Sequence, residues 1–310
     1  MKHIQLPGLK QGVSQLIMGS DYFSPDVYEL VSANLDAFVA IGGNTIDTAY
    51  IYAGGKSEQA IGMWLEERGN REAINVWTKG GHPHHGVPQV NKQAIYDELM
   101  TSLERLRTDY IDVYALHRDD TNVPVGEIVE ILNGHVEAGR IRAFGGSNWT
   151  TARLQEANAY AAAHGLRGFE FSSPNLSLAK AQEPYWADCI SVDGEILAWH
   201  EQTGLPIFSW SSQARGFFTG RFTPEDRTDA DLVRVFYNDD NWERYRRAEE
   251  LGKQKGFSTI QIALAYVLNQ SFPTAAIIGP RNEAEMKSCL EATTIPLTPE
   301  EIKWLDLRTR

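Results

Sequence analysis

The stretch Gly42-Gly43-Asn44-Thr45-Ile46-Asp47-Thr48-Ala49-Tyr50-Ile51-Tyr52 carries the pattern that decides the fold. A short apolar run ends on the carboxylate of Asp47, and a polar loop follows that brings a second ionisable side chain, Tyr52, five residues later. Parallel α/β barrels present their catalytic groups in this way, at strand ends and in the loops that follow them. The stretch therefore predicts a parallel strand that delivers Asp47 and Tyr52 to one rim of the fold.

Short apolar strands and amphipathic helices alternate along the rest of the chain. Eight strands are predicted near residues 14, 44, 75, 111, 142, 168, 207 and 275, the sixth covering 168–171. Strands that alternate with helices indicate βαβ units and a parallel sheet, and eight such units favour a closed (β/α)8 TIM barrel. The Pro7-Gly8 turn predicts an N-terminal hairpin, and helices over 283–290 and 299–307 are expected as C-terminal extra helices.

Two further expectations concern the organisation of the chain. Residues 211–240 are polar and contain Gly216, Gly220 and Pro224, so they are expected to form one long loop. No shift of composition and no linker divides the sequence, so residues 1–310 are expected to form a single domain.

Composition and charge restrict the function. The net charge of −12 argues against nucleic acid or an anionic membrane as the main partner, since both demand a basic surface. Two cysteines, Cys189 and Cys289, suggest no disulfide framework. We find no signal peptide and no apolar run long enough for a membrane span, so a cytoplasmic protein is expected. The oligomeric state stays open.

Ionisable residues stand at the ends of three consecutive predicted strands. Asp47, Lys79 and His117 each follow an apolar strand, and Tyr52 lies one loop away from Asp47. Taken alone, an aspartate at a strand end is more often a helix cap, a lysine is more often solvated, and a histidine more often has a structural role. Because the carboxyl ends of barrel strands converge on one rim, the four together predict an active site.

These four groups suit the reduction of a carbonyl. A tyrosine is a poor acid near neutral pH, but a nearby ammonium such as Lys79 stabilises its phenolate. Asp47 can hold Lys79 in place, and His117 can donate a hydrogen bond to a substrate oxygen. With no predicted metal cluster or covalent nucleophile, the hydride must come from a cofactor.

The cofactor is not predicted to bind by a Rossmann fingerprint or a P-loop, because neither motif occurs in the sequence. Barrel enzymes can instead hold phosphates with the loops that follow strands seven and eight. Those loops here carry small and basic residues suited to a pyrophosphate and a ribose phosphate: Ser211, Gly216, Arg221, Gly279 and Arg281.

Several motifs in order resemble the aldo-keto reductase superfamily over nearly the whole chain. They are G-G-N-T-I-D-T-A-x-x-Y at 42–52, W-T-K at 77–79, D-Y-I-D-V-Y-A-L-H-R at 109–118 and G-R-I-R-A-F-G-G-S-N at 139–148. The resemblance implies a (β/α)8 barrel that binds NADP(H), with NAD(H) left open, and reduces a small carbonyl compound. It implies a catalytic tetrad of Asp47, Tyr52, Lys79 and His117, with Tyr52 as the general acid.

The resemblance also implies which residues contact the cofactor and the substrate. Ser147 and Asn148 would bind the nicotinamide amide, Trp210 would stack on its ring, and Arg281 would meet a 2′-phosphate. The full set of expected cofactor contacts is Gly19, Ser20, Asp21, Asp47, Ser147, Asn148, Ser173, Trp210, Ser211, Gln213, Gly216, Arg221, Gly279, Arg281 and Glu285. On the substrate side the expected contacts are Tyr22, Tyr52 and His117.

The sequence departs from the family pattern at three places. Ser172 or Ser173 stands near a common Gln at the end of strand six. Ser288 and Cys289 replace an acid and an Asn, and Glu285 replaces a common Gln. These departures affect the nicotinamide and adenine contacts rather than the tetrad.

Two alternative functions remain beside carbonyl reduction. Some relatives serve as NADP(H)-binding regulatory subunits with little turnover, although the intact tetrad argues against that role. The second alternative is a metal-dependent hydrolase, suggested by the three histidines in the loop Gly80-Gly81-His82-Pro83-His84-His85. The spacing of these histidines does not match the H-x-x-x-H pair of a metal-binding helix, and no nearby cysteine or second histidine cluster completes a site. We therefore predict no metal and expect this loop at the rim.

Overall fold

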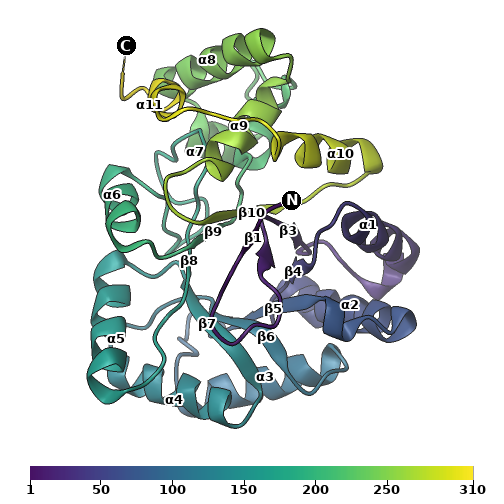
Figure 1. Ribbon diagram of the computed structural model, residues 1–310, viewed down its shortest axis with the longest axis vertical. Helices are drawn as coiled ribbons and strands as arrows, with labels where there is room; N and C mark the ends of the chain where they lie inside the picture. Colours follow the sequence, from purple (N-terminus) through teal and green to yellow (C-terminus); the bar gives the residue numbers. More distant parts are fainter. Residues whose placement is uncertain (310) are drawn as a thin grey trace. The chain divides into compact units, whose positions relative to one another are not determined.

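The computed structural model describes residues 1–309 in two compact units, one of Lys2–Ser173 and one that begins at Pro174 and includes Met1. The strands follow the hydrogen-bonded order β10-β3-β4-β5-β6-β7-β8-β9 of a closed barrel. Parallel strands connected through helices give the predicted TIM barrel, with the predicted N-terminal hairpin and C-terminal helices (Figure 1). The single domain expected from the sequence stays a prediction.

The first unit supplies six parallel strands that are buried along nearly their whole length. Continuous apolar strands of this kind are typical of parallel sheets covered on both faces. The strands are β3 (Leu16–Gly19), β4 (Thr45–Asp47), β5 (Asn75–Gly80), β6 (Ile111–Leu116), β7 (Ile141–Ser147) and β8 (Ser172–Ser173). Gly19 pairs with Asp47, Lys79 with Ala115 and Ser147 with Ser173. This register brings the polar strand ends to the same edge.

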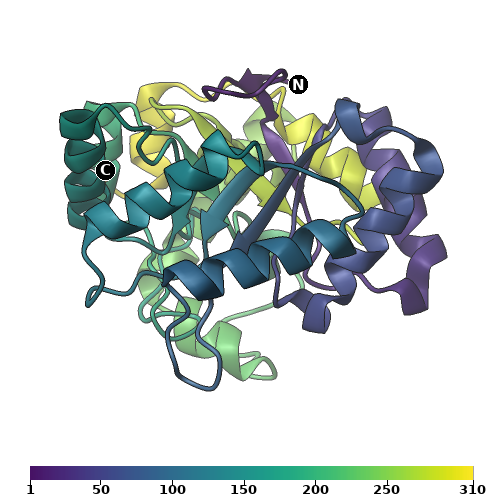
Figure 2. The same cartoon turned by 90° about the horizontal axis from the view of Figure 1, so that it is seen from below.

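Helices lie outside these strands in the first unit (Figure 2). In α4, for example, Ile128, Val129 and Leu132 form the buried stripe that amphipathic spacing predicts. The α-helices are α1 (Tyr28–Ala40), α2 (Lys56–Arg68), α3 (Lys92–Arg105), α4 (Val125–Glu137) and α5 (Thr151–His164). Three short 3-10 turns join them to the strands, namely η1 (Pro25–Val27), η2 (Tyr52–Gly55) and η3 (Arg71–Ala73).

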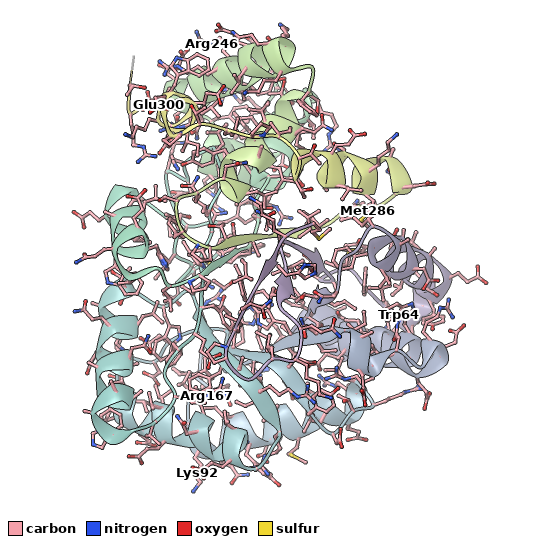
Figure 3. All side chains as sticks on the ribbon, viewed as in Figure 1. Trp64, Lys92, Arg167, Arg246, Met286 and Glu300 are labelled. Atoms are coloured by element: carbon pink, nitrogen blue, oxygen red, sulfur yellow. The ribbon has the colours of Figure 1, made fainter. Side chains whose placement is uncertain are left out.

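The N-terminal hairpin, β1 (His3–Ile4) paired with β2 (Val13–Ser14), is held by side chains at the start of the strands. The Arg167 guanidinium, labelled in Figure 3, donates to the backbone oxygens of Pro7 at 2.7 Å and Arg142 at 2.6 Å. The Asn44 amide donates to the Gly12 oxygen at 2.9 Å. The hairpin is thus tied to the end of the first unit opposite the polar strand ends.

The second unit contains two parallel strands, β9 (Ile207–Ser209) and β10 (Thr274–Ile278). Its helices are α6 (Gly194–Thr203), η4 (Ala214–Thr219), α7 (Ala230–Phe236), α8 (Asp239–Lys255), α9 (Thr259–Leu268), α10 (Glu283–Ala292) and α11 (Pro299–Leu305). Helix α9 is buried on nearly all sides and begins with a capping box between Ser258 and Gln261. No helix among residues 1–309 is long and apolar enough to cross a membrane.

Several boundaries differ from the prediction, including the ends of α10 and α11 by two residues each. The sixth barrel strand is Ser172–Ser173 rather than 168–171, because the Asn158 amide binds both the N–H and the oxygen of Phe169. Residues 211–240 are not one loop, since η4 and α7 form within them and α7 buries Leu232, Val235 and Phe236. The first barrel strand begins only at Leu16, because residues 13–14 form the second strand of the N-terminal hairpin.

Two helical glycines give a matched test of the packing. A Cβ on Gly62 in α2 would lie 2.3 Å from the backbone oxygen of Arg105, whereas a Cβ on Gly134 in α4 would meet nothing within 4 Å. We expect Gly62→Ala to lower the free energy of unfolding by about 1–3 kcal/mol through overpacking. We expect Gly134→Ala to raise it by about 0.5–1 kcal/mol through helix propensity. Equal effects of the two changes in urea unfolding would contradict this packing.

Candidate active site

The centre of the candidate site is a buried ion pair between the ends of β4 and β5. The Lys79 ammonium donates to a carboxylate oxygen of Asp47 and to the Thr48 backbone oxygen, the latter at 2.8 Å. Both residues are only 3% exposed. Burial raises the pKa of Asp47 to about 6 while the Lys79 charge opposes that rise. Burial lowers the pKa of Lys79 while Asp47 opposes the fall, so each charge stabilises the other.

Tyr52 lies next to this pair. The Lys79 Nζ is 3.2 Å from the Tyr52 hydroxyl oxygen and 4.7 Å from the centre of its ring. The loop that carries Tyr52 turns sharply through η2, where Ala53, Gly54 and Gly55 all have positive φ. A phenol oxygen within hydrogen-bond distance of an ammonium is an arrangement that can release a proton.

His117 completes the group at the end of β6. Its ring meets the Tyr52 ring edge to face, with 5.7 Å between the centroids. Burial lowers the pKa of His117 well below its usual range, and the charges of Lys79 and Arg118 lower it further. The imidazole is therefore neutral near pH 7 and carries one N–H. Its buried Nδ1 has no hydrogen-bond partner among residues 1–309.

The ends of β7 and β8 bring together three other predicted residues. The Ser147 hydroxyl donates to the Ser173 backbone oxygen at 3.1 Å, and the Asn148 amide donates to the Ser147 hydroxyl at 3.1 Å. Asn148 has a φ of 60°, a left-handed backbone that asparagine tolerates better than most residues. The Ser173 hydroxyl is buried without a hydrogen-bond partner among residues 1–309. This cluster offers amide and hydroxyl groups suited to a carboxamide.

The predicted residues after β3 begin with Ser20, whose side chain is buried. Its hydroxyl donates to the Asp47 backbone oxygen at 2.7 Å and lies 2.7 Å from the Ser57 hydroxyl. Ser20 thereby stabilises the backbone at the end of β4. Gly19 is buried at the end of β3, and Asp21 is exposed beside it. The half-buried Tyr22 ring meets Phe23 edge to face, 5.0 Å between centroids.

Within the second unit, the predicted residues after β9 form a sharply turned loop. Trp210 lies directly after the strand, and its indole N–H is buried without a hydrogen-bond partner in residues 1–309. Ser211 has a φ of 47°, and Gly216, with a φ of 88°, packs against the Arg221 guanidinium. Gln213 accepts a weak bond from the Cys289 thiol at 3.8 Å. Successive left-handed residues turn backbone N–H groups to one side, which favours an anion.

The predicted residues after β10 surround the start of α10. Gly279 follows the strand directly. The Arg281 backbone N–H donates to the Glu285 carboxylate at 2.9 Å, and Asn282 caps the helix by accepting from the Glu285 N–H. The Glu285 carboxylate is therefore hydrogen-bonded to the backbone of the loop that precedes α10.

Residues that the sequence did not single out hold the tyrosine loop in position. The Arg105 guanidinium donates to the Tyr50 backbone oxygen at 2.8 Å and lies 3.2 Å from the buried Glu58 carboxylate. Glu58 also accepts from the Thr78 hydroxyl at 2.6 Å, one residue before Lys79. An arginine in the last turn of α3 is an ordinary helix-end residue in the sequence, so no local signal reveals this contact.

The histidine loop is likewise anchored by a residue that was missed. The buried Glu98 carboxylate accepts from the Gly81 N–H at 2.6 Å and lies 3.1 Å from the His84 ring. Within residues 1–309, no three His, Cys, Asp or Glu side chains are grouped so that they could hold a metal ion. In the sequence, only the position of Glu98 on the inward face of its predicted helix could have indicated this contact.

The burial of neutral His117 predicts a dependence of stability on pH. In the unfolded chain a histidine takes up a proton near pH 6.5, whereas the folded site opposes protonation. Stability from this group is present above about pH 6.5 and is lost as the pH falls, by at most about 1.4 kcal/mol per pH unit. The free energy of unfolding of wild type relative to His117→Gln should therefore decrease between pH 7.5 and 5. A constant difference in guanidinium unfolding would show that His117 titrates normally.

Comparison with known proteins identifies the family of the chain. The sequence profile described as Aldo/keto reductase family matches residues 15–307. Norsolorinic acid reductase of Aspergillus flavus is 29% identical over 88% of this chain and 69% of its own length. Aldo-keto reductase YhdN of Bacillus subtilis is 28% identical over 89% of this chain and 81% of its own.

Solved structures share the fold. The glycerol dehydrogenase of Gluconobacter oxydans matches with a TM-score of 0.79 and 25% identity, over 98% of this chain and 94% of that one. The aldo/keto reductase of Klebsiella pneumoniae, solved with NADP and acetate, matches with a TM-score of 0.74 and 24% identity, over 99% and 95%. With the family profile spanning the barrel, this chain belongs to the aldo/keto reductase family of oxidoreductases.

Proposed function

We propose that this protein reduces an aldehyde or ketone to an alcohol with NADPH, and that Tyr52 is the general acid. The observation that carries the proposal is the contact of the Lys79 ammonium with both the Asp47 carboxylate and the Tyr52 hydroxyl. A proton donor next to a fixed positive charge is what the developing alkoxide of a carbonyl reduction requires.

Each residue of the group has a separate role in this proposal. Tyr52 donates its proton to the carbonyl oxygen, and the Lys79 charge stabilises the phenolate that remains. Asp47 keeps Lys79 charged and fixed inside the barrel. The neutral His117 donates its N–H to the same carbonyl oxygen and orients it, since a charged imidazolium is disfavoured there.

The residues present fit a nicotinamide cofactor. The buried, unpartnered Ser173 hydroxyl within residues 1–309 lies beside Ser147 and Asn148, and this cluster would hold the carboxamide. In the second unit Trp210 would stack on the ring, the 211–216 loop and Arg221 would hold the pyrophosphate, and Arg281 would hold a 2′-phosphate. When bound, the reduced nicotinamide supplies the hydride.

The substrate is proposed only as a small carbonyl compound. The relatives named above include a norsolorinic acid reductase and a glycerol dehydrogenase, which differ in the size and polarity of the compounds their names specify. We further propose that the chain acts as a single domain in the cytoplasm.

Removal of one hydroxyl tests the general acid. We expect Tyr52→Phe to lower kcat for NADPH-dependent aldehyde reduction by about 10²–10⁴-fold, the usual contribution of general acid catalysis. NADPH binding, followed by fluorescence, should change little. Tyr50→Phe is the matched control, because it removes a hydroxyl from the same loop and keeps the ring that stacks on His84. We expect Tyr50→Phe to retain at least half of the activity.

The result separates reduction from a regulatory role. If Tyr52→Phe turned over as fast as wild type, Tyr52 would not be the acid. Tight NADPH binding by wild type, with no oxidation at 340 nm on a panel of aliphatic and aromatic aldehydes, would instead favour an NADP(H)-binding regulatory subunit.

Cofactor preference tests the proposed role of Arg281. An arginine pairs strongly with a phosphate, and NADH lacks the 2′-phosphate. We expect Arg281→Ala to raise KM for NADPH by about 10-fold or more while KM for NADH changes less than twofold, because a charge-assisted hydrogen bond contributes about 1.5–3 kcal/mol. Equal changes in both KM values would place the 2′-phosphate elsewhere.

A further inference from the structure

A second imidazole faces His117 from the loop after β5. The His82 ring meets the His117 ring edge to face, with 5.1 Å between their centroids, and His117 in turn meets the Tyr52 ring. His82 is half-buried, so part of its side chain is accessible to solvent. The connection between β5 and α3 extends away from the strands of the first unit in Figure 2. The proposed reaction assigns no task to His82.

The hydrogen bonding of His82 fixes which nitrogen is an acceptor. Its Nδ1 is 3.0 Å from the Pro83 backbone oxygen, and because a carbonyl oxygen only accepts, Nδ1 carries the proton. Burial lowers the pKa of His82, with Arg118 and His84 adding to the effect, so the ring is neutral near pH 7. With the proton on Nδ1, Nε2 carries the lone pair of the ring and is the nitrogen that can accept a hydrogen bond.

The loop that carries His82 is fixed on both sides of it. The Glu98 carboxylate holds the Gly81 N–H at 2.6 Å on one side and lies 3.1 Å from His84 Nε2 on the other. The His84 ring stacks on Tyr50, and the His84 backbone pairs with Val87. An acceptor held this firmly costs little ordering entropy when it binds a ligand, which is what recognition by a single hydrogen bond requires.

We propose that His82 Nε2 accepts a hydrogen bond from a substrate hydroxyl next to the reacting carbonyl, so that His82 selects α-hydroxy aldehydes and ketones. Tyr52 and His117 offer donors to the carbonyl oxygen, whereas His82 offers an acceptor one ring away. A carbonyl oxygen only accepts and an adjacent hydroxyl can donate, so this polarity matches a hydroxycarbonyl compound. The inference rests on the carbonyl reduction proposed above and names its substrate class.

The test compares lactaldehyde with propanal, which differ only in the α-hydroxyl, with NADPH at pH 7.5. The hydroxyl also changes the reactivity of the carbonyl, so the measured quantity is the change in the ratio of the two kcat/KM values between wild type and variant. We expect His82→Phe to lower the lactaldehyde-to-propanal ratio by about 5–10-fold, the range for one hydrogen bond. Its kcat/KM for propanal should stay within about threefold of wild type.

Two further variants control for packing and for the loop. His82→Gln keeps a side-chain oxygen acceptor, so it should lower the ratio less than His82→Phe does. His85→Gln removes an exposed imidazole from the same loop and should leave the ratio unchanged.

The outcomes separate this inference from the proposed reaction. A ratio that stays within twofold of wild type in His82→Phe, with propanal still reduced, overturns the role of His82 alone. Equal loss on both aldehydes assigns His82 to the packing of His117 and also overturns it. If wild type reduces neither aldehyde nor any other carbonyl compound, the reaction itself is wrong and the inference falls with it.

Discussion

The ion pair between Lys79 and Asp47 is the constraint on which the site depends. A charge taken out of water costs several kcal/mol unless a partner and hydrogen bonds compensate, so neither residue is stable at this depth without the other. The ends of β4 and β5 must therefore stay in register, with Asp47 beside Trp77 and Lys79 two residues further on. The pairing that builds the barrel also sets the distance from the ammonium to Tyr52.

A second set of buried charged side chains fixes the loops that follow β4 and β5. Arg105 and Glu58 fix the backbone at Tyr50, and Glu98 fixes the backbone at Gly81. Both loops contain left-handed residues that have no ladder to stabilise them. Side chains from α3 supply the missing backbone partners, and Glu58 of α2 holds the Arg105 guanidinium. Helix packing therefore determines where the aromatic and imidazole rings lie. The close approach of α2 to the Arg105 backbone, possible only at Gly62, belongs to the same arrangement.

The sequence revealed the strand ends but not these supports. Asp47, Lys79 and His117 were predictable because each ends an apolar strand, and parallel strands converge at one edge. The start of the sixth strand was not predictable, since the side chain of Asn158 hydrogen-bonds the backbone of Phe169, 11 residues away in the sequence. The roles of Arg105 and Glu98 were not predictable for a similar reason. A hydrogen bond from a helix side chain to the backbone of a distant loop leaves no periodic pattern in the sequence.

Burial also fixes the protonation states around Tyr52. His117 and His82 both lie where burial and neighbouring positive charges oppose protonation, and Lys79 contributes to this at His117. The two imidazoles are therefore neutral hydrogen-bonding groups near pH 7 rather than proton sources. The ammonium of Lys79 is held by Asp47, and in the proposed reaction this leaves the Tyr52 hydroxyl as the proton donor. In the same proposal the Lys79 charge has two effects. It stabilises the Tyr52 phenolate, and it opposes protonation of His117, so that the donor and acceptor roles do not exchange.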